Sequence, residues 1–463
     1  MASPGVAQAD AAAPPDGLPV PRRYWAIAAI ILAICMSVLD ATIANVALPS
    51  IARDFHASKA ASIWVINSYQ LAILATLLPL AALGEIVGYR KVSQTGMVIF
   101  TLASLGCAFS TSLLTMSIAR VIQGLGAAGI MSVNAALVRF TYPHHMLGRA
   151  IGINAFAVAV AAAIGPTIAS AILAIAHWRW LFAINLPIGI VTVSIAMYAL
   201  PVTERSPRRL NYAGAILLAA TFVLLVSGLQ ALAHDTAAPL ALLEIAAGVA
   251  VGLALARHEV HRPTPIIPFD LLKVRLFALS VATSICSFTA QTGALVSLPF
   301  EIQRLGHSAV ETGLFMTPWP VGVGVAAPIA GWLADRYHAG VLCAAGLLAM
   351  AIGMTLLAYV PYGASGADFL WRMALCGLGF GFFQTPNNRA LLTSTPRPRS
   401  GAAGGMLSTA RLLGQTLGAA GVALLFRAYP ADGSNIALLT AAGISFVAAL
   451  VSVSRVTAPA LRG

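Results

Sequence analysis

The chain has 463 residues, of which 59% are hydrophobic and only 9% are charged, and its mean hydropathy is +0.87. A soluble globular protein needs more polar surface than this composition supplies, so the sequence predicts a polytopic membrane protein. The net charge of +12 does not indicate a nucleic-acid partner, because the basic residues collect in alternate loops. All five cysteines lie in apolar runs and at no metal-ligand spacing, so we expect no metal site, no cofactor and no disulfide.

Apolar runs of about 20 residues, the length that crosses a bilayer as a helix, follow one another along the chain. The breaks between them are charged, Pro-rich or Gly-rich. They predict an all-α protein with fourteen spans, at residues 25–48, 60–82, 92–111, 113–136, 149–174, 180–200, 211–231, 237–256, 277–300, 311–333, 341–360, 368–391, 401–427 and 435–454.

The distribution of Lys and Arg predicts the orientation. With the N-terminus placed inside, most of the 27 basic residues fall in inner loops and tails, and few fall in outer loops. Basic residues concentrate on the cytoplasmic side of membrane proteins, so both termini are expected in the cytoplasm. The first residues lack a basic segment followed by an apolar core and a cleavage site, so we expect a disordered tail and no signal peptide.

The sequence also contains an internal repeat. An inner loop with a small residue, an acid and a base follows the second span at 81–91, and a similar one follows the tenth span at 331–337. Transporters are often built from repeated halves, so spans one to six and nine to fourteen are expected to be matched bundles. The predicted units are a tail (1–22), an N-terminal six-helix bundle (23–203), an inserted helix pair (204–259), a C-terminal six-helix bundle (260–456) and a second tail (457–463).

Asp40 is the first functional candidate, because it lies inside the first apolar run. A charged group at the centre of a bilayer costs about 2.5–3.5 kcal/mol or more, so such residues usually face a protein interior and mark an ion or substrate route. Arg120 in the fourth span has a similar depth below the outer surface, roughly 10–14 Å at 1.5 Å per residue. The two residues are expected to pair: Asp40 would take up and release a proton, and the charge of Arg120 would bias the pKa of Asp40. The alternative is a structural ion pair that only orders the bundle.

Several segments together resemble a known family. Residues 39–49, the run 120–126, the Trp178-Arg179-Trp180 segment with 185–189, and the inner loop at Gly84 are similar to motifs of the fourteen-span drug:proton antiporters of the major facilitator superfamily. Gly165-Pro166 is similar to the kink of the fifth helix, although Ala169-Ser170 stands where the family has a glycine pair. The resemblance runs from about residue 25 to 455.

The resemblance implies an inner gate and a proton-driven export mechanism. Glu85 would hold the inner side shut against the start of the thirteenth span, Gly84 and Gly88 would permit a tight loop, and Arg90 would complete the gate, with Asp335 and Arg336 as a weaker second version. The alternative is that these basic loops only set the topology. Gly165 and Pro166 would provide helix packing and a kink.

A further group is expected to line the substrate cavity. Glu301, where the family usually has an uncharged residue, is expected near the outer mouth and attractive to cations, or simply solvated. Arg411 and Gln415, one turn apart, would line or brace the cavity. Aromatic rings would stack on flat ligands. The whole candidate set is Asn45, Tyr69, Gln123, Phe156, Glu301, Trp319, Phe383, Arg411 and Gln415.

The sequence excludes one energy source. A phosphate loop of an ATPase ends in Gly-Lys-Ser/Thr, and the three lysines, Lys59, Lys91 and Lys273, follow Ser, Arg and Leu. We therefore expect a multi-pass exporter of the cell membrane, monomeric, that exchanges protons for small lipophilic or cationic compounds. The alternatives are a dedicated exporter of one metabolite, a non-transporting sensor and a membrane enzyme; an enzyme is disfavoured because no cluster of catalytic residue types is present.

Overall fold

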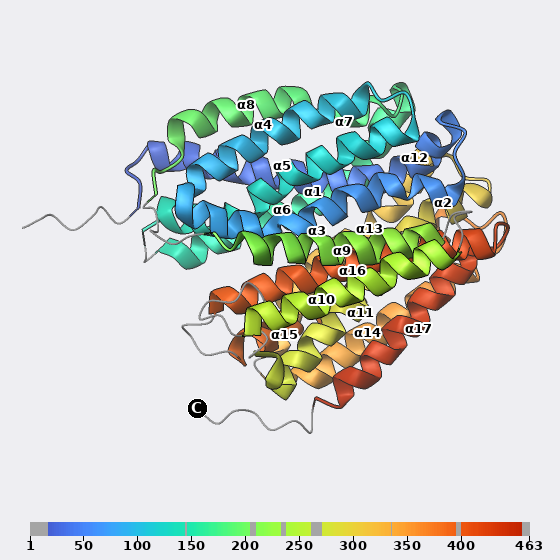
Figure 1. Ribbon diagram of the computed structural model, residues 1–463. Coiled ribbons are helices and arrows are strands. Elements are labelled where there is room, and N and C mark those ends of the chain that lie inside the picture. Colours follow the sequence, from blue (N-terminus) through green and yellow to red (C-terminus); the bar gives the residue numbers. More distant parts are fainter. Residues whose placement is uncertain are drawn as a thin grey trace, which may run out of the picture.

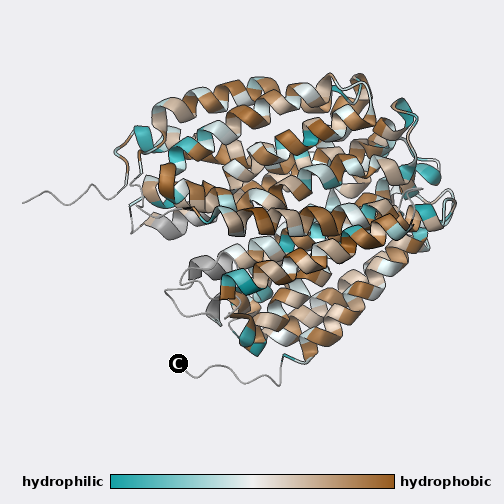
Figure 2. Cartoon of the chain, in the orientation of Figure 1, coloured by the Kyte–Doolittle hydropathy of each residue, from teal (hydrophilic) through white to brown (hydrophobic). Residues whose placement is uncertain are grey.

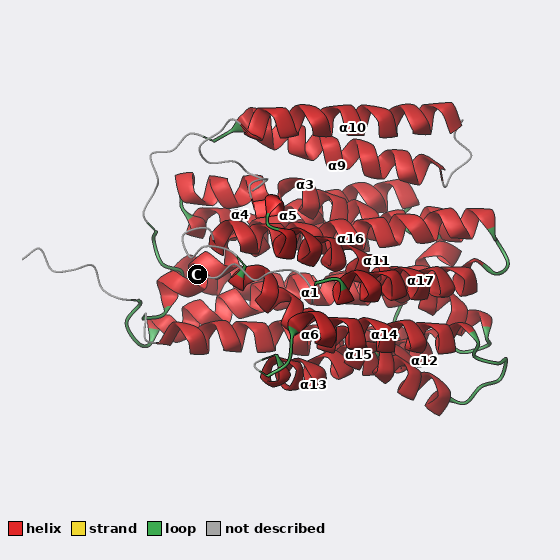
Figure 3. Cartoon of the chain, turned by 90° about the horizontal axis from the view of Figure 1, so that it is seen from below, coloured by secondary structure: helices red, strands yellow, loops and turns green. Residues whose placement is uncertain are grey.

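The computed structural model describes residues 17–143, 146–203, 210–232, 238–260, 271–334, 336–394 and 400–455, and every regular element in these ranges is helical (Figure 3). The helices are α1 (Arg22–Asp54), α2 (Lys59–Ser62), α3 (Trp64–Val87), α4 (Tyr89–Ala108), α5 (Leu113–Thr141), α6 (Leu147–Ile175), α7 (Trp180–Ala183), α8 (Asn185–Ala199), α9 (Tyr212–Leu232), α10 (Ala238–Val260), α11 (Arg275–Arg304), α12 (Ala309–Met316), α13 (Pro318–Leu333), α14 (Ala339–Ala358), α15 (Gly366–Thr393), α16 (Ser400–Ala428) and α17 (Gly433–Val453).

In the described ranges these helices form fourteen long stretches, because α2, α7 and α12 each lead directly into the next helix, at Ile63, Ile184 and Thr317. Twelve of the stretches are long and apolar enough to cross a membrane. The other two, α4 and α15, correspond to the expected spans 92–111 and 368–391 and carry more polar residues. The sequence expected unbroken spans; the break before α13 coincides with Pro318, which lacks the N–H that a continuing helix would use.

Hydrophilic residues gather at the ends of the helices and in the connections, whereas the middle of the helices is hydrophobic (Figure 2). The helix surfaces expose large apolar side chains, such as Leu102, Ile118 and Leu253. A surface of this kind is expected where lipid is the solvent. The first described helix begins and the last one ends at the same end of the molecule (Figure 1).

The helices before and after α9 and α10 form two groups. In the first group α5 packs on α3 and α4, and α1 packs on α6 and α8; in the second, α15 packs on α13 and α14, and α11 packs on α16 and α17. Helices α9 and α10 pack on each other and lie beside the contact between α3 and α16 (Figures 1 and 3). We call the groups the N-half (α1–α8) and the C-half (α11–α17).

The two halves repeat the same local chemistry. α1 and α11 both end after a Leu-Pro pair, Leu48-Pro49 and Leu298-Pro299, and the next helix is N-capped by Ser58 or Ser308. The side chain of Arg53 donates to Gln303, which lies 250 residues later at the matching position of the second half (3.4 Å). The matched ends of the two halves thus meet each other directly.

The halves touch closely at the end of the molecule that carries α2 and α12. The hydroxyls of Thr167 and Thr317 are hydrogen-bonded at 2.8 Å. Gly313 of α12 packs on α6 so closely that a Cβ would stand 2.5 Å from the carbonyl oxygen of Pro166. Toward the other end, α14 and α17 lean away from the N-half (Figure 1), while α3 and α16 stay in contact.

The expected tails differ from the structure at one boundary. Residues 1–16 and 456–463 lie outside the described residues. The last residues of the tail expected over 1–22 are part of the folded chain. The backbone N–H of Leu18 donates to the carbonyl oxygen of Thr141 (3.0 Å), and α1 begins at Arg22. Arg22 donates to the carbonyl oxygens of Ala199 and Leu200 at the end of α8.

Candidate functional site

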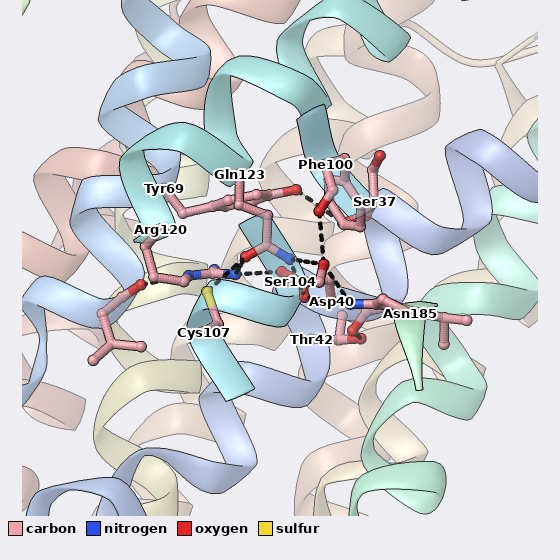
Figure 4. A network of polar contacts seen from close by, with 12 residues as sticks. Ser37, Asp40, Thr42, Tyr69, Phe100, Ser104, Cys107, Arg120, Gln123 and Asn185 are labelled. Atoms are coloured by element: carbon pink, nitrogen blue, oxygen red, sulfur yellow. Dashed lines mark hydrogen bonds and ion pairs between the residues drawn. The ribbon is translucent and has the colours of Figure 1, made fainter. Parts of the chain in front are cut away.

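A buried polar network lies inside the N-half, where α1, α4, α5 and α8 meet (Figure 4). Its centre is Asp40 of α1, and the guanidinium of Arg120 on α5 forms an ion pair with the Asp40 carboxylate. Both side chains are 1% exposed. The structure therefore brings together the two charges that the sequence placed at similar depth.

The carboxylate of Asp40 has three donors. One oxygen accepts from Arg120, and the other accepts from Gln123 Nε2 at 2.8 Å and from Asn185 Nδ2 at 2.9 Å. Hydrogen bonds to the charged form of a buried carboxylate offset part of its loss of hydration. Ser104 of α4 extends the network, accepting from Gln123 at 2.8 Å.

Arg120 is held on all sides. Its Nε donates to the carbonyl oxygen of Val65 at 2.9 Å, and its Nη1 donates to Gln123 Oε1 at 2.7 Å. The ring of Tyr69 lies under the guanidinium with 4.1 Å between Cζ and the ring centroid, and Tyr69 itself donates to the backbone of Ser37. Tyr69 and Gln123, expected on a cavity wall, are thus buried parts of this network.

The sequence did not single out Ser104, Cys107 or Asn185 for this site. Asn185 begins α8, and an amide in an otherwise apolar span was the available signal. Ser104 and Cys107 look like ordinary small residues of a membrane helix, and only the packing of α4 on α5 shows that they face Gln123.

The C-half builds the same helix crossing without charges. Gly124 packs on the carbonyl of Tyr69, and Gly377 packs on the carbonyl of Trp319 in the same way. Aligned on these two glycines, Arg120 corresponds to Met373 and Gln123 to Cys376. Aligned on Pro49 of α1 and Pro299 of α11, Asp40 corresponds to Ala290. These three residues of the C-half are fully buried.

This comparison separates a packing role from a chemical one. Replacing a buried ion pair by apolar residues of suitable volume is often neutral or stabilising, so an ion pair is weak evidence for stability. The C-half shows that this architecture closes with Ala, Met and Cys at the matching places. The presence of charges in the N-half alone therefore favours a chemical role for Asp40 and Arg120.

The expected inner gate lies at the end of α3. Gly84 is tightly packed, since a Cβ there would stand 2.8 Å from both Tyr89 and Val133. Gly88 joins α3 to α4 with φ +100°, a left-handed conformation that favours glycine. Glu85 is exposed at this end of α3. Arg90 donates to the carbonyl oxygen of Met197 on α8, inside the N-half.

In the second half, Asp335 lies outside the described residues. Arg336 is exposed and stacks on Trp332, with 4.1 Å between Cζ and the ring centroid. Of the pair predicted from the sequence, the structure therefore describes Arg336 and not Asp335.

Three candidates for the cavity lie in packed environments instead. Trp319 and Phe383 are each 1% exposed and belong to one hydrophobic cluster, so their rings are buried in the packing of the helices. Glu301, expected near the outer mouth as an attractant for cations or as a solvated acid, is 3% exposed and forms an ion pair with Arg304, one turn later (2.6 Å). That pairing neutralises the charge that was expected to attract cations.

The other candidates are accessible. Phe156 of α6 is 71% exposed, without close packing around its ring. Asn45 is partly exposed on α1, and its buried Oδ1 has no hydrogen-bond partner. Arg411 and Gln415 are partly exposed on α16. Of the residues expected to contact a substrate, these four therefore have side-chain surface that a bound compound could reach.

Gly165 and Pro166 lie where α6 crosses α1. A Cβ on Gly165 would stand 2.0 Å from the Thr42 hydroxyl, so this crossing needs a glycine. Helix α6 continues through Pro166 to Ile175. Ala169-Ser170 replaces the glycine pair of the resembled family, and Gly313 of the facing helix provides the close approach in its place.

Comparison with known proteins agrees with this architecture. The family model described as Major Facilitator Superfamily matches residues 30–419. An uncharacterized transporter of Escherichia coli K12, YebQ, is 50% identical over 96% of this chain and 98% of its own length. The riboflavin transporter RibZ of Clostridioides difficile is 30% identical (86% of this chain, 87% of RibZ), as is the multidrug resistance protein Stp of Mycobacterium tuberculosis (84% and 73%).

Solved structures share the fold at lower identity. A POT family transporter in complex with a thioalcohol-conjugated peptide superimposes with a TM-score of 0.73 over 93% of this chain and 96% of that one, at 13% identity. At this identity the likeness concerns the fold alone.

Proposed function

Because this chain belongs to the Major Facilitator Superfamily, and is therefore a multi-pass transporter of the cell membrane and not an enzyme, we propose that it is a proton-driven antiporter that exports small organic compounds. The observation that carries the proposal is the Asp40–Arg120 network, a buried charged site that the matching half replaces by Ala290 and Met373. A titratable group kept at such a cost, at a place where the matching half carries none, fits a coupling role.

The proposed cycle exchanges two arrangements of the halves. With both termini in the cytoplasm, the contact of Thr167 with Thr317 closes the outer side, and the halves open inward. Protonation of Asp40 removes the negative charge that holds Arg120, so the pair loosens and α1 is free to shift against α5. Release of the proton inward restores the ion pair. The two halves rock in this way around the bound compound.

Efflux into inverted membrane vesicles under an imposed pH gradient tests this proposal. We expect Asp40→Asn to abolish gradient-driven transport while binding of the compound is kept, since the amide has the shape of the carboxyl but does not titrate. Glu311→Gln is the matched control, because Glu311 is an exposed capping residue of α12 that glutamine can replace. Proton-driven transport at the native rate in Asp40→Asn would remove Asp40 from the coupling role.

The gate is proposed at the end of α3. Glu85 would bind the N-terminus of α16, whose exposed N–H groups and helix dipole favour a carboxylate. We expect Glu85→Gln to speed opening of the inner side, raising downhill leak of compound and lowering coupled transport several-fold. Leak in proteoliposomes without a gradient measures this; unchanged leak together with unchanged transport would leave Glu85 a topology residue only.

Whether the compounds are many or one is a second question. Stp is named a multidrug resistance protein and RibZ a riboflavin transporter, both at 30% identity, so relatives of both kinds exist. Growth of cells expressing the chain against a panel of unrelated toxicants separates the two. Resistance to many structurally unrelated compounds would support a multidrug exporter of lipophilic compounds, and resistance to one compound would support a dedicated exporter.

A further inference from the structure

Arg411 lies near the middle of α16, on a strip of this helix that the packing of its neighbours does not cover. On one side of the strip, Gly414 and Gly418 pack on α11, where added Cβ atoms would stand 2.5 Å from backbone oxygens. On the other side, Gly405 packs on Leu78 of α3, and Leu412 belongs to the hydrophobic cluster of the N-half.

Helix geometry fixes what lies between those two sides. Each residue turns the helix by about 100°, so Ser408, Arg411 and Gln415 form one line along α16. All three are partly exposed, whereas Ala410, Leu412 and Gly414 beside them are buried. The line of polar side chains therefore faces the junction of the C-half with the N-half.

Within the part of the chain that the structure describes, the guanidinium of Arg411 has no partner. None of the hydrogen bonds, ion pairs or cation–π contacts of the described residues involves Arg411. An arginine is charged at every physiological pH, and an uncompensated cation at membrane depth is costly.

Four other arginines of the helices, or directly beside them, differ in this respect. Arg120 pairs with Asp40, Arg304 with Glu301, and Arg372 with Asp368. Arg455 donates to Asn387, Ser280 and Ser452. The acids of these pairs are engaged by their own arginines, and Arg411 is the charged side chain in the line formed by Ser408, Arg411 and Gln415.

We propose that Arg411, with Ser408 and Gln415, binds an anionic group of the transported compound: a carboxylate, a sulfonate or a phosphate ester. The inference rests on the proposed transport function and narrows its substrate class, replacing the cationic compounds expected from the sequence. A guanidinium binds such groups through two parallel N–H···O bonds, and the amide and hydroxyl one turn away supply further donors. The lipophilic remainder of the compound would lie against the apolar side chains of the two halves.

Equilibrium binding of two matched dyes tests the proposal without any gradient, so it is independent of proton coupling. Carboxyfluorescein and rhodamine 123 share a xanthene ring system but carry opposite charges. With the purified full chain in phosphatidylcholine nanodiscs and fluorescence anisotropy as the readout, we expect the anionic dye to bind at least about tenfold more tightly. Preference for the cationic dye, or no binding of the anionic one, would overturn the proposal.

Substitutions then place the site. Arg411→Gln should weaken binding of carboxyfluorescein at least about tenfold and leave rhodamine 123 unchanged or improved. Arg411→Lys should keep part of the affinity, and the double variant Arg411→Gln/Gln415→Arg, which moves the charge by one turn, should restore part of it. Arg372→Gln, which removes a paired arginine of α15, is the control and should change neither dye.

Two further outcomes decide against the proposal. Equal anion affinity in native chain and Arg411→Gln, with both eluting as folded monodisperse protein, would make Arg411 a bracing residue. A lipid phosphate is the other source of a bound anion. The affinities of the native chain and of Arg411→Gln for carboxyfluorescein are therefore compared again with phosphatidylglycerol in place of part of the phosphatidylcholine. If the two affinities become equal, a lipid headgroup occupies Arg411 and the compound does not.

Discussion

Asp40 and Arg120 bury opposite charges at a place where the matching residues of the other half, Ala290 and Met373, are apolar. Desolvation of two ions costs several kcal/mol and is recovered only through good geometry and further hydrogen bonds. Gln123 and Asn185 supply those hydrogen bonds here. Substitutions at these residues can therefore distinguish a role in proton coupling from a role in stability.

Copying the C-half into the N-half is the corresponding prediction. The triple variant Asp40→Ala/Arg120→Met/Gln123→Cys should lose less stability than Arg120→Met alone, since no unpaired charge remains, but should lose proton-coupled transport. The single variant Arg120→Met should lose about 3–5 kcal/mol, because it leaves Asp40 buried and unpaired. Thermal unfolding in detergent measures both; equal destabilisation of the triple and single variants would favour a structural ion pair.

At the scale of the elements, the two halves depend on glycines where helices cross. Gly124 lets α5 approach α3, and Gly377 lets α15 approach α13, with added Cβ atoms at 2.5 Å and 2.0 Å from the carbonyl oxygens of Tyr69 and Trp319. In membranes, small residues of this kind permit the close packing that lipid itself does not drive. A backbone oxygen cannot move aside as a flexible side chain can.

Gly124→Ala and Gly377→Ala should therefore each cost about 1–3 kcal/mol by overpacking. Gly421→Ala is the matched control on α16, since an added Cβ there meets nothing within 4 Å, and it should leave stability unchanged or slightly raised. The melting temperatures of the three variants in the same detergent compare them directly. A neutral Gly377→Ala would mean that α13 and α15 separate more easily than their contacts indicate.

For the whole molecule, the contact between the halves at the α2 and α12 end predicts a lock. Thr167 and Thr317 have their hydroxyls 2.8 Å apart across the junction. In the variant Thr167→Cys/Thr317→Cys, oxidation should cross-link the halves and stop transport, and a reductant should restore it. The two single substitutions, Thr167→Cys and Thr317→Cys, are the controls, because the native chain already contains five cysteines. Full transport by the cross-linked chain would show that this end need not open.

The sequence alone determined the class of the protein, the course of its helices to within a few residues at most ends, and the candidacy of Asp40 and Arg120. These features follow from local composition, because about 20 apolar residues make a spanning helix wherever they occur and a charge among them is costly wherever it points. The resemblance to drug:proton antiporters came from local motifs too, and the match to the Major Facilitator Superfamily confirms the superfamily.

Only the tertiary structure decided which side chains meet. The rotation of each helix against its neighbours decides whether a side chain faces the contact between the halves or the packed interior, as for Trp319, Phe383 and Glu301. The hydropathy of a helix that is apolar on all sides does not predict this rotation. The same rotation gave Asp40 its partners from α5 and α8, whereas Arg411 has none among the residues that the structure describes. Burial and pairing belong to the assembled helices, and the sequence of any one helix does not contain them.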